Sequence, residues 1–236
     1  MKLPENAMLD KNNIWFIDDK NIQKTRVVIE HRGYDYISRS EFYHIEGMED
    51  FIAKVDDPCI LFGSIRIKKM LQEFYKVENK LSNVDLPLTY YQKNGKAVGL
   101  IVPFYQNSIS IRNLFGIYGE EFIKFYHHDE CLERNLLMLD LEILYRLWEM
   151  YDAGIVYLDI HKGNFIVSDN HIKVIDFEPG YVKFKQNDNN YAKIMEKYCQ
   201  LVNSLHFSLK IRNLLIFSYG SFTETEKDIK RLYKSI

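Results

Sequence analysis

The stretch GIVYLDIHKGNFIVSDNHIKVIDFEPG, residues 154–180, decides the fold. It holds two short apolar runs separated by a polar turn, which predicts a β-hairpin. Asp159 and Asn164 precede the first run, and Asp176 follows the second. Because Asp159 and Asn164 lie where a helix gives way to a strand, both side chains can point to the same place. The hairpin then returns Asp176 to them.

These three residues carry oxygen ligands of the kind that Mg²⁺ prefers. Asn164 and Asp176 suit a magnesium site, and Asp159 is left to accept a hydrogen bond from an incoming hydroxyl. Taken singly, each residue is more simply explained as a turn residue at a strand end. Their spacing, with Phe177 directly after Asp176, favours a functional site.

The sequence YLDIHKGNFIV resembles the catalytic loop H-R-D-L-x-x-x-N of the protein-kinase-like superfamily, and VIDFE resembles its metal-binding D-F-G. The resemblance implies a phosphotransferase that uses ATP and Mg²⁺. Asp159 would be the catalytic base or would orient the hydroxyl, and Asn164 and Asp176 would bind Mg²⁺.

The same resemblance implies a phosphate-binding lysine on an N-terminal strand. FIAKV matches that strand, which makes Lys54 the candidate for the α- and β-phosphates. A glutamate on the next helix would hold Lys54 in place; Glu73 is our first choice and Glu78 the second. Taken alone, Lys54 is equally well explained as an ordinary lysine on a solvated strand face. Adenine would contact the backbone after the last strand of this lobe, at Pro103, Phe104 and Tyr105.

Working outward, the pattern predicts an α+β, protein-kinase-like bilobal fold. Residues 1–28 are polar and mixed, and we expect an N-terminal extension. Residues 29–103 show strand-like runs, an amphipathic helix with Ile67 and Phe74 on its apolar face, and a hairpin at Asn94-Gly95. They predict a small N-lobe with an antiparallel sheet and one helix. Residues 104–236 predict a reduced, mostly helical C-lobe, with a long helix from about residue 130 to residue 151.

The sequence departs from the kinase pattern in several places. Ser38, Arg39 and Ser40 stand where a glycine-rich phosphate loop is expected, and non-glycine residues restrict such a turn. Tyr157 and Leu158 replace the histidine and arginine of the catalytic loop, so activation through a phosphorylated loop is not expected. Glu178 replaces the glycine after Asp-Phe, and A-P-E is absent.

Three functions remain open on the sequence. A minimal protein kinase, acting on Ser, Thr or Tyr of a protein, is favoured by the short segment between Pro103 and Gly154. DIHKGN is also similar to the D-L-H-P-G-N of aminoglycoside and choline phosphotransferases, which implies a small-molecule acceptor. The missing glycines favour a pseudokinase scaffold that binds a partner protein.

Composition limits the partners and the compartment. With 31 basic and 33 acidic residues, the net charge of −2 gives no reason to expect nucleic acid or a membrane surface as a partner. The three cysteines form no disulfide or zinc pattern. Without an apolar run of about 20 residues, we expect a cytoplasmic protein, with delivery into another cell left open.

Overall fold

The structure, a computed structural model, describes residues 7–11, 13–26, 40–45, 47–56, 63–114, 130–206 and 221–235. The chain divides into two compact units. Unit 1 contains residues 1–106 and 177–180, and unit 2 contains residues 107–176 and 181–236. The boundary that we expected after residue 103 therefore lies after Gln106. Four residues directly after Asp176 belong with unit 1.

Unit 1 is built on a seven-stranded sheet with the order β1-β2-β6-β7-β5-β4-β3. Its pairs are antiparallel except for β2 and β6, which run parallel. The strands are β1 (Met8–Leu9), β2 (Trp15–Asp18), β3 (Ile22–Arg26), β4 (Ser40–Ile45), β5 (Met48–Asp56), β6 (Thr89–Lys93) and β7 (Lys96–Pro103). Asn94 and Gly95 join β6 to β7 with φ angles of +51° and +76°, the turn geometry that the Asn-Gly pair predicted.

Within the segment 1–28 that we expected to form an N-terminal extension, the described strands β1, β2 and β3 are part of this sheet. Phe16 of β2 lies opposite Tyr90 of β6, and the two rings stack with centroids 5.6 Å apart. Asp10 Oδ2 accepts hydrogen bonds from Lys68 Nζ at 2.7 Å and from Tyr90 Oη at 3.1 Å. The expectation was wrong because parallel pairing depends on a distant partner strand, which local composition does not reveal.

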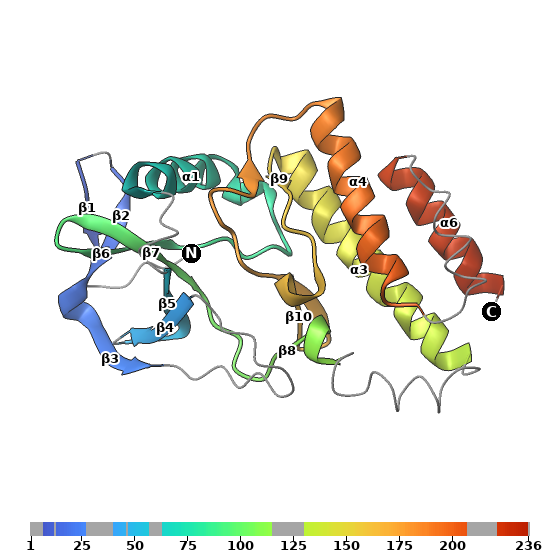
Figure 1. The fold of residues 1–236 in the computed structure, drawn as a ribbon, viewed down its shortest axis with the longest axis horizontal. Coiled ribbons are helices and arrows are strands. Elements are labelled where there is room, and N and C mark those ends of the chain that lie inside the picture. Colours follow the sequence, from blue (N-terminus) through green and yellow to red (C-terminus); the bar gives the residue numbers. More distant parts are fainter. Residues whose placement is uncertain are drawn as a thin grey trace. The chain divides into compact units, whose positions relative to one another are not determined.

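One helix, α1 (Gly63–Val77), packs against β7 and β6 of the sheet (Figure 1). Its buried side chains recur at spacings of three and four, as expected for one apolar face: Ile67, Met70, Leu71 and Phe74. The short 3₁₀ helix η3 (Glu78–Lys80) follows directly. A core cluster elsewhere in the sheet joins inward-facing side chains of five strands and the residue before β6: Ile17, Ile45, Met48, Ala53, Leu88, Tyr91 and Ile101.

Unit 2 combines helices with two small sheets. The helices α3 (Glu130–Ala153), α4 (Asp188–Asn203) and α6 (Phe222–Ser235) lie side by side (Figure 1). The first sheet has the order β11-β10-β8 and the second pairs β12 with β9. Their strands are β8 (Ile109–Ser110), β9 (Val156–Tyr157), β10 (Phe165–Ser168), β11 (His171–Val174) and β12 (Val182–Lys183). This mixture of a sheet-rich unit and a helix-rich unit confirms the predicted α+β class.

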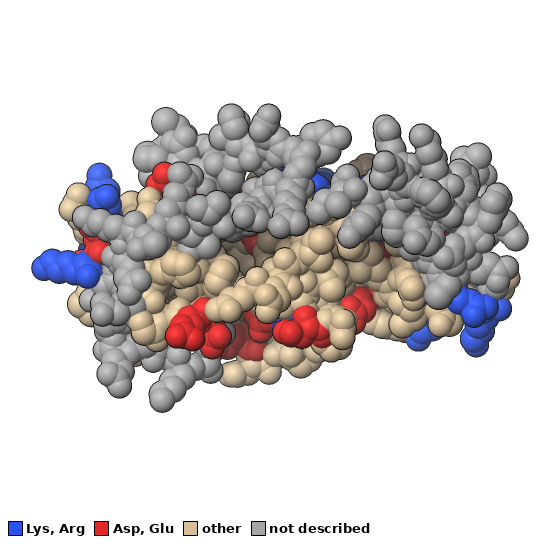
Figure 2. Space-filling view, turned by 90° about the horizontal axis from the view of Figure 1, so that it is seen from below, with Lys and Arg blue, Asp and Glu red and all other residues tan. Residues whose placement is uncertain are grey.

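Among the described residues, no helix combines the length and the apolar character that crossing a bilayer requires. On the face drawn in Figure 2, the described part of the surface carries separate groups of acidic and basic side chains.

The helices of unit 2 enclose a charged cluster around His206. The ring of His206 is fully buried, with Nε2 2.5 Å from Asp140 Oδ2 and Nδ1 3.0 Å from Glu133 Oε2. Burial lowers the pKa of His206, but hydrogen bonds and charge from Asp140 and Glu133 outweigh it and raise the pKa to about 9. His206 is therefore an imidazolium at neutral pH, and it joins the segment after α4 to α3.

We expect this cluster to make stability depend on pH. The folded pKa of His206, about 9, lies above its ordinary value of 6.5. Its contribution is thus complete below pH 6.5 and is lost as pH rises through about 9. His206→Gln, which leaves two carboxylates poorly paired, should lower the free energy of unfolding by about 3 kcal/mol at pH 6.5. At pH 9.5 the free energies of unfolding of the variant and the wild type should differ by less.

Urea unfolding of His206→Gln and of the wild type at pH 6.5 and pH 9.5 measures the free energies of unfolding. His171→Gln is a suitable control, because His171 is exposed and contacts Glu142 at 3.3 Å on the surface. A destabilisation by His206→Gln that is equal at both pH values would contradict the charged state of His206.

Candidate active site

The predicted catalytic segment begins where α3 ends. Gly154 has a φ of +100°, which stops the helix, and Ile155 N donates to Met150 O at 2.8 Å. The chain then forms β9, which pairs with β12 and is fully buried. Leu158 N donates to Tyr181 O at 2.9 Å, so main-chain contacts continue up to the residue before Asp159.

The structure brings Asp159 and Asn164 into direct contact. Asn164 Nδ2 donates to Asp159 Oδ2 at 2.8 Å and to the Asp159 carbonyl oxygen at 3.0 Å. Asn164 is buried at the end of a 3₁₀ turn, η4 (Lys162–Asn164), directly before β10. Both bonds come from the amide nitrogen, so the amide oxygen is the group that Asn164 retains for a ligand.

The residue before Asp176, Ile175, forms a backbone hydrogen bond with Asn164. Ile175 N donates to the Asn164 carbonyl oxygen at 3.0 Å, and Tyr157 Oη donates to the Ile175 carbonyl oxygen at 2.9 Å. The hairpin that makes this return possible is the one predicted, with Phe165 opposite Val174. Asp176 has a φ of +68°, a left-handed conformation that non-glycine residues adopt rarely and that is found at functional sites.

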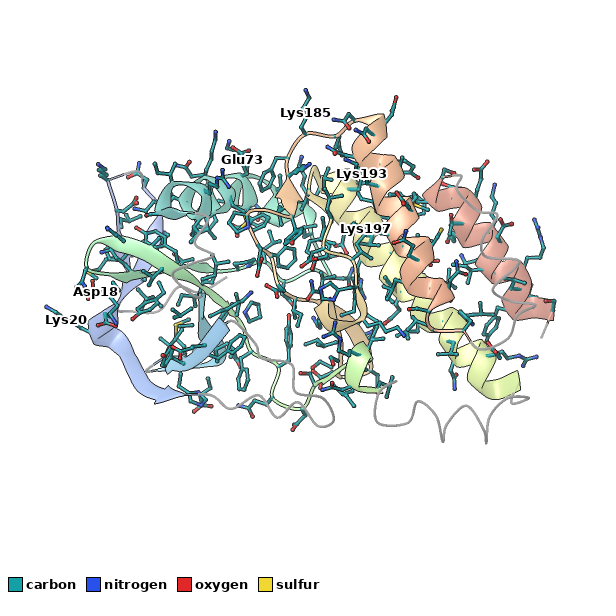
Figure 3. The ribbon with its side chains drawn as sticks, viewed as in Figure 1. Asp18, Lys20, Glu73, Lys185, Lys193 and Lys197 are labelled. Carbon is teal, nitrogen blue, oxygen red and sulfur yellow. The ribbon has the colours of Figure 1, made fainter. Side chains whose placement is uncertain are left out.

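Side chains of helices α3 and α4 form hydrogen bonds with the backbone of the hairpin and of the loop before it. From α3, Glu142 Oε2 accepts from Ile172 N at 2.9 Å, and Arg146 Nε donates to Ile172 O at 3.1 Å. From α4, Lys197 Nζ donates to the Leu158 carbonyl oxygen at 2.5 Å. Lys193 and Lys197 lie one turn apart on α4 (Figure 3). Lys197 was not predicted; its place beside the buried Tyr198 on an amphipathic helix was the only signal.

His161 lies beside Asp159 as a neutral ring. Its Nδ1 accepts a hydrogen bond from Gly163 N at 3.0 Å, so Nε2 carries the proton and lies 3.7 Å from Asp159 Oδ1. Burial lowers the pKa of His161; Asp159 opposes this, and Arg112 adds to it. At this distance the Nε2–H group makes neither a hydrogen bond nor a close ion pair with Asp159 Oδ1.

Lys54 in unit 1 lies on β5, an interior strand of the sheet. It stands opposite Phe42 of β4 and Leu100 of β7, and 5% of the residue is exposed. Its ammonium group contacts Glu178 Oε1 at 3.2 Å. A buried lysine needs such a partner to remain charged.

The predicted partner of Lys54 was wrong. Glu73 of α1 (labelled in Figure 3) is half-exposed, and its carboxylate contacts Lys76 Nζ at 2.6 Å, one turn along the helix. Glu78, the second choice, is exposed in η3. The spacing from Lys54 to Glu73 was suitable, but Glu73 borders the apolar face of α1 and turns to the solvent side.

The other predicted nucleotide contacts have different outcomes. Phe104 N already donates to the Asp50 carbonyl oxygen at 2.8 Å, and Pro103 has no N–H, so any backbone contact of these two residues with adenine would come from their carbonyl groups. Tyr105 Oη donates to Asp85 Oδ2 at 2.9 Å. Ser38 and Arg39 lie outside the described residues, and Ser40 is the first residue of β4.

The two predicted metal ligands carry oxygen donors of the kind that Mg²⁺ accepts. Within the residues that the structure describes, three or more His, Cys, Asp or Glu side chains do not gather into a metal site. One carboxylate and one amide oxygen, from Asp176 and Asn164, are the few protein ligands that Mg²⁺ takes when phosphate and water supply the rest.

Comparison with solved structures gives a protein-kinase fold. The structure entitled "Crystal structure of BubR1 kinase domain" matches with a TM-score of 0.62 at 10% sequence identity, covering 89% of this chain and 83% of that chain. No family model and no curated protein sequence matches the chain. The predicted protein-kinase-like fold is confirmed. Because 1068 chains of solved structures match, the fold alone does not identify an activity or a substrate.

A glycine beside Lys54 gives a test of how this strand is positioned. A Cβ atom added at Gly99 of β7 would lie 2.1 Å from the carbonyl oxygen of Lys54, which is backbone and cannot turn away. We expect Gly99→Ala to force β5 and β7 apart and to lower the free energy of unfolding by about 3 kcal/mol. Val98→Ala, at the neighbouring half-buried position, should lower it by only about 1 kcal/mol.

Chemical denaturation of the two variants and the wild type gives the comparison. Equal stability of Gly99→Ala and the wild type would show that the strands do not approach closely at Lys54.

Proposed function

We propose that the protein is an ATP- and Mg²⁺-dependent phosphotransferase that moves the γ-phosphoryl group of ATP to a hydroxyl of Ser, Thr or Tyr in a protein. The observation that carries the proposal is the arrangement around Asn164. Its side-chain amide binds Asp159, and its main-chain carbonyl binds the residue before Asp176. Together the two contacts tie a candidate base and the segment of a candidate metal ligand to one residue, and positioning of these groups is what phosphoryl transfer requires.

In this proposal Asp159 acts on the acceptor. Asp159 Oδ2 is occupied by Asn164 Nδ2 at 2.8 Å, whereas Oδ1 lies 3.7 Å from the nearest nitrogen of His161. Oδ1 would accept the hydrogen bond of the incoming hydroxyl and then its proton. The acceptor oxygen forms a bond to the γ-phosphorus, the bond from the γ-phosphorus to the β,γ-bridging oxygen breaks, and ADP leaves.

Asn164 Oδ1 and the Asp176 carboxylate would hold Mg²⁺. When bound, Mg²⁺ would neutralise charge on the triphosphate and on the leaving ADP. Asp176 has a left-handed backbone, and the hydrogen bond from Ile175 N to the Asn164 carbonyl oxygen keeps the two ligand-bearing segments together. Lys54 of unit 1 would contact the α- and β-phosphates.

A protein acceptor is favoured over a small molecule by the size of the chain around the site. The segment between Pro103 and Gly154 holds β8 and α3 among its described residues. Phosphotransferases of the aminoglycoside and choline type generally insert further helices there to enclose a small molecule. Only 50 residues, 104–153, separate Pro103 from Gly154, and this short length favours a protein acceptor.

We expect the purified protein to transfer labelled phosphate from γ-labelled ATP, with Mg²⁺, to itself or to a protein in a lysate. Asp159→Ala should lower the rate by about 10²–10⁴-fold, the usual contribution of a general base. Asp176→Ala should abolish transfer at ordinary Mg²⁺ concentrations. Asp188→Ala provides a control, because Asp188 is exposed in the first turn of α4.

Protein labelling that persists in both Asp variants would overturn the assignment of the site. ATP consumption that needs an aminoglycoside, a choline-like compound or a sugar, with no labelled protein, would establish the small-molecule alternative.

A pseudokinase scaffold is the second candidate, and the sequence at Ser38, Arg39 and Ser40 favours it. These residues stand where a glycine-rich phosphate loop is expected, and non-glycine side chains restrict such a turn. The two candidates differ in whether the folded protein binds nucleotide.

We expect ATP with Mg²⁺ to raise the melting temperature, because a ligand that binds only the folded state stabilises it. At about 100 times the dissociation constant the gain is about 2.7 kcal/mol, or roughly 5–10 °C for a chain of this size. Asp176→Ala should remove most of the Mg²⁺-dependent part of this shift. Melting curves that ATP, ADP and Mg²⁺ leave unchanged would favour the scaffold.

A further inference from the structure

The partner of Lys54 comes from an unexpected part of the chain. Glu178 is 124 residues away in sequence and only two residues after Asp176, yet it belongs with unit 1 and lies 3.2 Å from Lys54 Nζ. The side chains are 7% and 22% exposed. Charges this well shielded interact more strongly than a surface pair, so the contact restricts the flexible lysine side chain.

Helix α1 offers no carboxylate in place of Glu178. Glu73 is the single acidic residue of Gly63–Val77, and it contacts Lys76. The buried face of α1 presents Met70 and Phe74, which are apolar. An ion pair between the strand lysine and this helix is therefore absent from the described structure of Lys54 and α1.

Aromatic packing fixes the segment that carries Glu178. The ring of Phe177 is buried and packs edge-to-face on Phe74, with centroids 5.7 Å apart and an interplanar angle of 84°. This contact attaches residues 177–180 to α1 through an apolar anchor. The position of Glu178 is thus set by its neighbour in the chain and not by Lys54 alone.

We propose that Glu178 is the positioning residue for Lys54, in the place of a helix glutamate; this rests on the proposed phosphotransferase function. Glu178 keeps the Lys54 side chain extended and charged, ready for the α- and β-phosphates. The lysine and the metal ligand Asp176 then depend on one short segment, and α1 contributes an apolar surface instead of a charge.

The kinetic test compares Glu178→Gln, Glu178→Asp and Glu73→Gln with the wild type, at a temperature at which all remain folded. We expect Glu178→Gln to raise the KM for ATP about tenfold and to lower kcat. Glu178→Asp should recover part of the loss because it keeps the charge. As a control, Glu49→Gln removes an exposed carboxylate on β5, the strand of Lys54, and should leave kcat and the KM for ATP as in the wild type.

Two kinetic outcomes would overturn the proposal. A lower KM for ATP in Glu178→Gln would show that the carboxylate competes with phosphate. A loss confined to Glu73→Gln would return the role to the helix.

A double-mutant cycle tests the pair without relying on activity. Lys54→Met and Glu178→Gln should each lower the melting temperature by roughly 4–8 °C. The melting temperature of the double variant should be no lower than that of the less stable single variant, because removing both charges leaves neither unpaired. Additive losses would show that the two side chains do not interact and would overturn the proposal.

The two experiments distinguish failure of this inference from failure of the proposed function. A non-additive cycle together with a wild type that neither binds nor uses ATP would overturn both the phosphotransferase and the role of Glu178 toward nucleotide. Activity in the wild type with an unaffected Glu178→Gln would overturn the role of Glu178 alone.

Discussion

The hydrogen bonds of one amide organise the candidate site. Asn164 Nδ2 binds both the carbonyl oxygen and the carboxylate of Asp159, and these contacts close the loop that precedes β10. The Asn164 carbonyl oxygen then accepts from Ile175 N and starts the return of the hairpin. With Asn164 buried, all of these groups need partners inside the protein, so the loop and hairpin have little freedom to rearrange.

The rest of unit 2 supports this arrangement through backbone contacts. Helix α3 binds both the N–H and the C=O of Ile172, and helix α4 binds the carbonyl oxygen of Leu158 through Lys197. These hydrogen bonds to main-chain atoms hold the segment of the candidate site whatever its own side chains are. This explains how Tyr157 and Leu158 can replace the histidine and arginine of the usual loop: Tyr157 Oη contributes its own bond to the Ile175 carbonyl oxygen.

Local patterns in the sequence predicted the local structure well. The Asn94-Gly95 turn, the apolar face of α1, the end of α3 at Gly154 and the hairpin before Asp176 all depend on residues close in sequence. Each follows from turn chemistry or helical periodicity, which act over a few residues.

What the sequence did not reveal depends on distant partners. The parallel pairing of β2 with β6 and the contact of Lys197 with Leu158 join segments far apart in the chain. Glu73 had suitable spacing from Lys54, but the direction of a half-exposed side chain on a helix depends on its surroundings, and Lys76 was nearer. The Phe104 N–H was similarly occupied by Asp50, a residue on another strand.

The parallel pairing of β2 also affects the order in which the chain folds. Thr89 Oγ1 donates to the Trp15 carbonyl oxygen across 74 residues of sequence, so β1 and β2 cannot join the rest of the sheet until β6 has left the ribosome. During synthesis the hairpin of β6 and β7 can form from neighbouring residues, whereas β1 and β2 must wait and then add to the β6 side of it. Once added, they cover the main-chain groups of β6 that would otherwise invite pairing with another chain, which makes the first residues a guard against aggregation.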